Sequence, residues 1–168
     1  MQVGPRRPRN VPPRIEPTGI LTGLKVRPIV AGVAVDYVAT YVAMYAYIVL
    51  FISRQLSERG ELSEEAVRNF LTSTEGLLIG FAIGTLCTVL GGYVAGRLAK
   101  EIEVKHGAFV GVGSLIVSAL EQAVSESGAL VPQWYLLVST LAIVPAGALG
   151  GYIAERLAKI KGAFTAPF

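Results

Sequence analysis

Four long apolar stretches separated by short polar segments dominate the sequence. They run over residues 28–52, 76–98, 107–124 and 133–154. Each is close to or above the length of about 20 residues that an apolar helix needs to cross a bilayer. The pattern predicts an all-α integral membrane protein, in which four transmembrane helices form a single domain over residues 28–160.

The segments outside these stretches are polar. Residues 1–27 are rich in proline and arginine, which predicts a disordered basic tail, and residues 161–168 form a second short tail. Between the first two spans, Ser63 precedes a short amphipathic pattern that predicts an interfacial helix. Thr72 and Glu75 then have the spacing of a capping box, which marks the start of the second span.

Small residues recur at every fourth position of the second predicted span. A four-residue step stays on one helix face. Such a face is unfavourable in a soluble helix, because glycine loses about 1 kcal/mol of helix propensity relative to alanine. In a membrane it lets a second backbone approach closely. We therefore predict helix packing through these residues and two glycines of the fourth span: Gly76, Gly80, Gly84, Thr88, Gly92, Gly96, Gly147 and Gly151.

A segment of eleven residues occurs twice with nine identical positions, at residues 90–100 and 149–159. Both copies place an aromatic residue before cations, as expected where a helix leaves the bilayer. Since both copies would leave on the same side, we predict two helical hairpins in a parallel repeat, packed through their glycine-rich faces. The predicted interface anchors are Tyr93, Arg97, Lys100, Trp134, Tyr152, Arg156 and Lys159.

Asp36 is the only acidic residue well inside a predicted span. A charge at this depth costs about 2.5 to 3.5 kcal/mol on insertion scales, so the carboxyl group needs a partner or a proton. Helical spacing predicts Tyr37, Thr40 and Tyr41 as its neighbours in an intramembrane polar site. Two interpretations stay open: a proton or cation site, and a hydrogen-bonded carboxyl group that fixes helix packing.

Three further residues are candidates for a functional role. Glu121 lies near the end of the third span, and His106 lies in the cationic connection before it. We expect both to be solvated. Pro145 removes one helical hydrogen bond and predicts a kink in the fourth helix, which is either a simple irregularity or part of a polar pathway.

Composition agrees with a membrane location. Apolar residues make up 52% of the chain and charged residues 16%, with a mean hydropathy of +0.55. The single cysteine, Cys87, excludes an intramolecular disulfide. Lys and Arg concentrate in the two tails and in the connection 97–105, which predicts that both termini are cytoplasmic and argues against nucleic-acid binding. The N-terminal tail is a candidate for contact with anionic lipid headgroups.

Two short motifs indicate a family. Gly91-Gly-Tyr-Val-Ala-Gly-Arg97 and His106-Gly-Ala-Phe109 resemble small four-helix prokaryotic membrane proteins, in which a Gly-Gly-Tyr-x-Ala-Gly-Arg helix exit precedes a His-Gly-Ala helix start. The resemblance covers about 30 of the 168 residues. It implies a location in the prokaryotic inner membrane and no particular activity. The second copy of the exit departs from the motif at Glu155 and at Lys161.

The sequence contains no motif of an enzyme, a cofactor site or a metal site, so we expect no catalytic residues and no cofactor. We predict a packing or assembly protein that forms a homo-oligomer or docks onto a larger membrane complex. The alternative is a small permease or channel for protons, cations or a small solute. A third interpretation is an enzyme that acts within the membrane or on lipid headgroups. An exposed face of small residues would favour assembly, whereas a cavity surrounded by Asp36, Glu121 and Pro145 would favour transport.

Overall fold

The computed structural model is all-α over the residues that it describes, which are residue 19 and the ranges 21–59, 64–124 and 132–164, without the side chains of 57–59 and 161–164. Four of its helices are long and apolar enough to cross a membrane. The predicted all-α fold with four candidate spans is therefore confirmed. In chain order, the helices are α1 (Val26–Arg59), α2 (Glu64–Thr72), α3 (Thr74–Ala99), α4 (Glu103–Val124) and α5 (Gln133–Phe164).

The long helices extend beyond the predicted spans. α1 continues to Arg59 instead of ending at residue 52, and α5 continues to Phe164 instead of ending at residue 154. Hydropathy marks where the apolar layer ends, but polar residues of good helix propensity continue the helix into the interface. In α5, Lys159 forms an ion pair with Glu155 one turn earlier, which supports this extension.

The two predicted tails lie mostly outside the described residues. Of the N-terminal tail, the part next to α1 is described, and there a turn over residues 21–23 precedes the helix. The predicted C-terminal tail is helical as far as Phe164. The predicted cap at Ser63 falls outside the described residues, and the short helix predicted after it is present as α2.

Local hydrogen bonds fix both ends of α3. The backbone N–H of Gly76 donates to the Oγ of Ser73 at 3.1 Å, so the N-cap lies one residue after the predicted Thr72. At the other end, Lys100 adopts a left-handed conformation with φ of 61°, and its N–H donates to the carbonyl oxygen of Gly96 at 3.1 Å. This cap turns the chain sharply and leads into α4.

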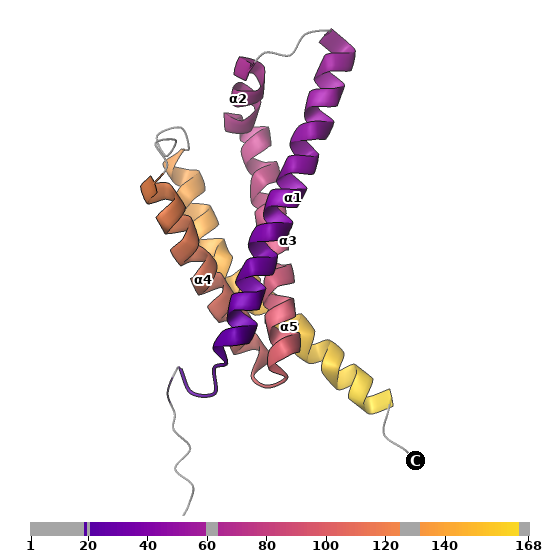
Figure 1. Ribbon diagram of the computed structural model, residues 1–168, viewed down its shortest axis with the longest axis vertical. Helices are drawn as coiled ribbons and strands as arrows, with labels where there is room; N and C mark the ends of the chain where they lie inside the picture. Colours follow the sequence, from indigo (N-terminus) through magenta and orange to yellow (C-terminus); the bar gives the residue numbers. More distant parts are fainter. Residues whose placement is uncertain (1–18, 20, 60–63, 125–131, 165–168) are drawn as a thin grey trace, which may run out of the picture.

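The helices form a V-shaped bundle (Figure 1). One arm contains α1 and α3, with α2 at its tip, and the other contains α4 and the first part of α5. The arms meet near the end where α3 turns into α4, and the end of α5 lies on the same side of the molecule (Figure 1). We call this the closed end and the opposite one, near α2, the open end. α5 packs against α3 and α4, and α1 packs against the same two helices.

Glycines allow the helices to touch backbone to backbone near the closed end. A Cβ atom on Gly92 would lie 2.2 Å from the carbonyl oxygen of Gly147, and one on Gly107 would lie 2.3 Å from the same oxygen. A Cβ atom on Gly151 would lie 2.3 Å from the carbonyl oxygen of Glu103. No side chain fits at these positions, so α5 lies directly on the backbones of α3 and α4.

The glycine-rich face of α3 packs over part of its length only. Gly92 and Gly96 contact α5, and Gly76 contacts the end of α2. At Gly84 a Cβ atom would meet no other atom within 4 Å, and at Gly80 it would meet one side-chain oxygen at 3.6 Å. The prediction that Gly84 packs against another helix is therefore wrong within the chain, because the arms diverge at this level, and Gly80 meets only the side chain of Tyr135 on α5.

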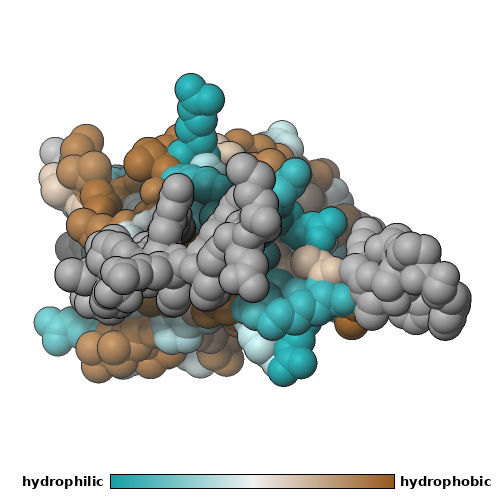
Figure 2. Space-filling model, turned by 90° about the horizontal axis from the view of Figure 1, so that it is seen from below, coloured by the Kyte–Doolittle hydropathy of each residue, from teal (hydrophilic) through white to brown (hydrophobic). Residues whose placement is uncertain are grey.

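The two copies of the repeated segment meet at the closed end. A Cβ atom on Gly150 would lie 2.6 Å from the backbone nitrogen of Tyr93. In the second copy, the guanidinium group of Arg156 lies 5.0 Å from the centre of the Tyr152 ring and donates to its hydroxyl group at 2.7 Å. Figure 2 looks onto this end and shows hydrophilic side chains projecting from it. The other predicted anchors are exposed: Arg97, Lys100, Trp134 and Lys159.

Replacing Gly92 by alanine should destabilise the protein, whereas the same replacement at Gly84 should not. The new Cβ atom at Gly92 would force α5 away from α3, while at Gly84 it would enter open space and alanine would add about 1 kcal/mol of helix propensity. Thermal unfolding of Gly92→Ala and Gly84→Ala in mild detergent measures the difference. An equal fall in Tm for both variants would contradict the conclusion that Gly92 packs against α5 and that Gly84 does not.

Candidate functional site

A cavity of about 260 Å³ lies between the two arms, on the open-end side of the glycine contacts. All four long helices line it. Towards the open end, residue numbers rise along α1 and α4 and fall along α3 and α5. We call the part of the cavity nearer the closed end its deep end and the part nearer the open end its mouth. Asp36, Thr88 and Ser114 lie at the deep end, and Tyr41, Glu121 and Tyr135 lie near the mouth.

Asp36 is the centre of the deep end and is 4% exposed. Ser114 Oγ of α4 donates to its Oδ2 at 2.6 Å, and Thr88 Oγ1 of α3 lies 3.2 Å from Oδ1 and 3.1 Å from Oδ2. Thr40, one turn further along α1, also lines the cavity. Hydroxyl groups from two other helices therefore meet at one carboxyl group.

The hydroxyl group of Thr88 has two competing acceptors. Its oxygen also lies 3.0 Å from the carbonyl oxygen of Gly84 on the same helix. A hydroxyl group donates one proton and can also accept. If Asp36 is ionised, Thr88 donates to the carboxylate; if Asp36 is protonated, its O–H can donate to Thr88, which then donates to Gly84. Rotation of one hydroxyl group thus accommodates both protonation states.

Two tyrosines extend the polar lining towards the mouth. The Tyr37 hydroxyl group lies 3.1 Å from Ser118 Oγ and 3.3 Å from the carbonyl oxygen of Ser114. One turn further along α1, Tyr41 donates to Glu121 Oε1 at 2.8 Å. Glu121 is exposed, in agreement with the expectation of a solvated acid. A chain of oxygen atoms therefore lines the cavity from Asp36 to the open end.

The charged residues that line the cavity are all acidic. The described residues around it include two acids and no basic residue. Within the described part of the chain, no three His, Cys, Asp or Glu side chains come close enough to hold a metal ion together. A cation in this cavity would therefore be bound by a single carboxylate, by hydroxyl and carbonyl oxygens, and by water.

The structure brings the predicted polar site together: Asp36, Tyr37, Thr40 and Tyr41 all line the cavity. Thr88, predicted to serve helix packing, is instead a hydrogen-bonding partner of Asp36. Ser114 and Ser118 did not enter the sequence prediction. Together with Glu121 they have i, i+4, i+7 spacing, which places all three on one face of α4 and is the signal that reveals them.

Pro145 does not belong to the cavity. Ile143 lines the cavity, and Pro145, two residues later on α5, is exposed. Two helical residues correspond to a rotation of about 200°, so these side chains point in nearly opposite directions. Of the two interpretations of Pro145, the structure therefore does not support a part in a polar pathway through this cavity.

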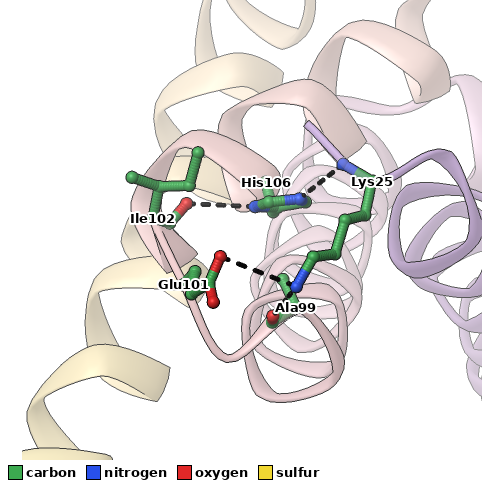
Figure 3. Close-up of polar contacts among 5 residues, drawn as sticks. All are labelled: Lys25, Ala99, Glu101, Ile102 and His106. Atoms are coloured by element: carbon green, nitrogen blue, oxygen red, sulfur yellow. Dashed lines mark hydrogen bonds and ion pairs between the residues drawn. The ribbon is translucent and has the colours of Figure 1, made fainter. Parts of the chain in front are cut away.

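His106 is buried, with an exposed fraction of 0%, so the expectation that it is solvated is wrong. α4 begins at Glu103, which places His106 on the inward face of a helix and not in a connection. Its Nε2 accepts the backbone N–H of Lys25 at 2.9 Å, and its Nδ1 lies 3.1 Å from the carbonyl oxygen of Ile102 (Figure 3). This pair of contacts fits a neutral imidazole with its proton on Nδ1.

Comparison with known protein families, with curated proteins and with solved structures finds no match. The residues around Asp36 therefore have to indicate the function. They offer an ionisable group, several hydroxyl groups and a water-accessible volume, and they lie in helices of transmembrane length.

Asp36→Asn should keep a stability close to that of the wild type, whereas Asp36→Leu should be less stable. The amide retains an acceptor for Ser114 and donors for Thr88. Leucine removes the acceptor of the buried Ser114 hydroxyl group, and an unsatisfied buried group costs about 1 to 3 kcal/mol. Thermal unfolding in mild detergent provides the comparison. Equal stability of the two variants would contradict a structural contribution of these hydrogen bonds.

Proposed function

We propose that this protein is a small membrane permease that exchanges a proton for a small monovalent cation at Asp36. The observation that supports this most strongly is the convergence of Asp36, Glu121 and hydroxyl groups from all four long helices around one cavity. Ionisable residues at membrane depth are expensive, and where they face a cavity they typically mark a path for ions or protons.

The glycine contacts make the permease a stronger proposal than an assembly protein. An assembly protein of the kind considered above needs an exposed face of small residues. Gly92, Gly96, Gly147 and Gly151 are instead in contact within the chain, and Gly84 faces the cavity. Pro145 does not support the permease interpretation, but Asp36, its central residue, forms hydrogen bonds with Thr88 and Ser114 on two other helices.

The chemistry of the lining favours a cation. An anion would meet two acids and no described basic side chain. Carboxylate, hydroxyl and carbonyl oxygens are hard ligands, which suit a hard cation. The volume of about 260 Å³ corresponds to roughly nine water molecules at about 30 Å³ each, so one cation with part of its hydration shell fits. A single deep carboxylate balances one positive charge, which favours a monovalent ion.

The exchange needs one proton and one cation. Protonated Asp36 releases its proton to water in the cavity as the cation arrives from the mouth, and the resulting carboxylate binds the cation. Thr88 then turns its hydroxyl proton from the Gly84 carbonyl oxygen to the carboxylate. Return of a proton reverses the step and releases the cation. The sum of charges at Asp36 and its ligand stays at zero throughout, which limits the cost of burial.

For the membrane location we propose the prokaryotic inner membrane, with the closed end and both termini in the cytoplasm. Exposed cations at the closed end support this orientation, because cytoplasmic segments carry an excess of Lys and Arg. The resemblance of the Gly91–Arg97 exit motif to prokaryotic membrane proteins supports the compartment. The cavity mouth would then face the outside.

Cysteine labelling tests this orientation. In a Cys87→Ala background, Lys159→Cys should react with a membrane-impermeant maleimide only in inside-out vesicles, because it lies at the closed end. Glu64→Cys, exposed on α2 near the open end, should react only in intact cells. The opposite pattern would reverse the proposed direction of the cavity.

The proposed exchange predicts that an imposed cation gradient drives proton movement through the wild-type protein and not through Asp36→Asn. Proteoliposomes loaded with a pH-sensitive dye, and challenged in turn with Na⁺, K⁺ and NH₄⁺ gradients, report the flux. The amide preserves the hydrogen bonds but cannot exchange a proton, so flux should fall to the level of empty liposomes.

Glu64→Gln is the matched control, because it makes the same chemical change at an exposed site on α2 away from the cavity. It should retain wild-type flux. Absence of flux from the wild type with all three cations would argue against the permease, and unchanged flux in Asp36→Asn would remove Asp36 from the mechanism.

A further inference from the structure

Three residues on α4 form a buried line from the cavity to the closed end. Among the residues that the structure describes, His106, Val110 and Ser114 are the largest side chains that are fully or almost fully buried, with exposed fractions of 0%, 0% and 2%. They are four residues apart, so they share one helix face at intervals of about 6 Å. Ser114 contacts Asp36 at the deep end of the cavity, and His106 lies beyond Val110.

Val110 fills the space between these two polar levels. A Cβ atom on Gly32 of α1 would lie 2.6 Å from Val110 Cγ2 and 2.9 Å from the Cβ atom of Ala95 on α3. Gly32, Ala95 and Val110 are all buried. Three helices therefore close on one another around Val110, and an apolar layer one side chain thick separates Asp36 from His106.

His106 joins the start of α1 to the start of α4 (Figure 3). The N–H that it accepts belongs to Lys25, the residue before α1, where no carbonyl group of the helix is available as a partner. The Lys25 side chain adds a hydrogen bond from Nζ to the Ala99 carbonyl oxygen at 3.0 Å and an ion pair with Glu101 at 3.7 Å. These contacts hold α1 against the turn between α3 and α4.

We propose that Val110 is the closed-end gate of the transport path and that His106 is the latch that keeps this gate shut. The proposal rests on the permease function proposed above. Passage from Asp36 to the closed end requires α1 to separate from α4 around Val110, and that movement has to break the contact between Lys25 and His106. Apolar constrictions of this kind close aqueous paths by excluding water.

Thiol accessibility tests the gate without requiring transport. In a Cys87→Ala background, Ser114→Cys places the chain's one thiol just beyond Val110 on the cavity side. A membrane-impermeant methanethiosulfonate reagent, added from either face of the membrane, measures its reaction rate. Lys159→Cys in a parallel preparation identifies the face that belongs to the closed end. With the gate intact, Ser114→Cys should react from the open-end face and resist reaction from the closed-end face.

Adding Val110→Ala should raise the reaction rate from the closed-end face by about tenfold or more. Val112→Ala is the matched control, because it makes the same change on the same helix at an exposed position. It should leave the rate unchanged. Equal rates in the two variants, or reaction from the closed-end face with Val110 intact, would overturn the gate.

The latch is tested by His106→Gln and His106→Leu in the same preparation. Glutamine can still accept the Lys25 N–H, whereas leucine cannot, so only the leucine variant should raise the closed-end rate. Elution from a size-exclusion column as a single symmetric peak shows that each variant is folded. If His106→Leu is not folded, the Val110→Ala measurement still decides whether Val110 is a gate. If the thiol reacts equally slowly from the closed-end face in folded His106→Leu and in His106→Gln, the proposed role of His106 as a latch is overturned.

These outcomes are independent of the flux measurement. Closed-end protection that Val110→Ala removes would establish a gate even if no tested cation moved, and the failure would then belong to the proposed substrate. If the wild type shows cation-driven proton flux but the thiol of Ser114→Cys reacts from both faces of the membrane, the permease proposal stands and the gate is rejected.

Discussion

Contact between helix backbones at the closed end is the constraint on which the rest of the structure depends. The carbonyl oxygen of Gly147 lies 2.2 Å from where a Cβ atom of Gly92 would be and 2.3 Å from where one of Gly107 would be. Lipid provides no hydrophobic drive between transmembrane helices, so close packing of this kind has to hold them together. Because the contacts are confined to one end, the arms separate towards the other, and the cavity between them follows.

Asp36 lies at the boundary between the packed and the open region. A Cβ atom on Gly91 would approach the Cβ atom of Asp36 to 2.9 Å, so glycine at this position allows α1 to lie against α3. Thr88, one turn earlier on α3, then comes within hydrogen-bonding distance of the carboxyl group. The same close approach that stabilises the bundle therefore also supplies the partners that a carboxyl group needs inside a membrane.

The two ends of the bundle differ in a way that suits a carrier. At the open end, hydroxyl groups and Glu121 face an accessible volume, whereas at the closed end Val110 is fully buried and glycines bring the helix backbones into contact. Transporters commonly alternate access by rocking one group of helices against another around a fixed site. In the proposed permease, the two arms are the moving groups, and the contact between Lys25 and His106 joins them at the end that has to open.

Local properties of the chain were readable from the sequence. Apolar stretches of transmembrane length fix the four spans, and the cost of a charge in hydrocarbon marks Asp36 as a residue that needs partners on its own helix and elsewhere. The neighbours of Asp36 on α1 follow from helical periodicity alone. The position where each helix ends is less well determined, because helix propensity extends beyond the apolar layer.

Relations between helices were decided by the tertiary structure. Gly84 and Gly92 belong to the same four-residue pattern, yet one faces a cavity and the other the backbone of α5. His106 stands among cations in the sequence but points into the bundle, and Ser114 reaches Asp36 from a different helix. The sequence determines which face of each helix is small or polar. Where helices cross, and hence which part of that face is in contact, depends on the contacts of all helices at once.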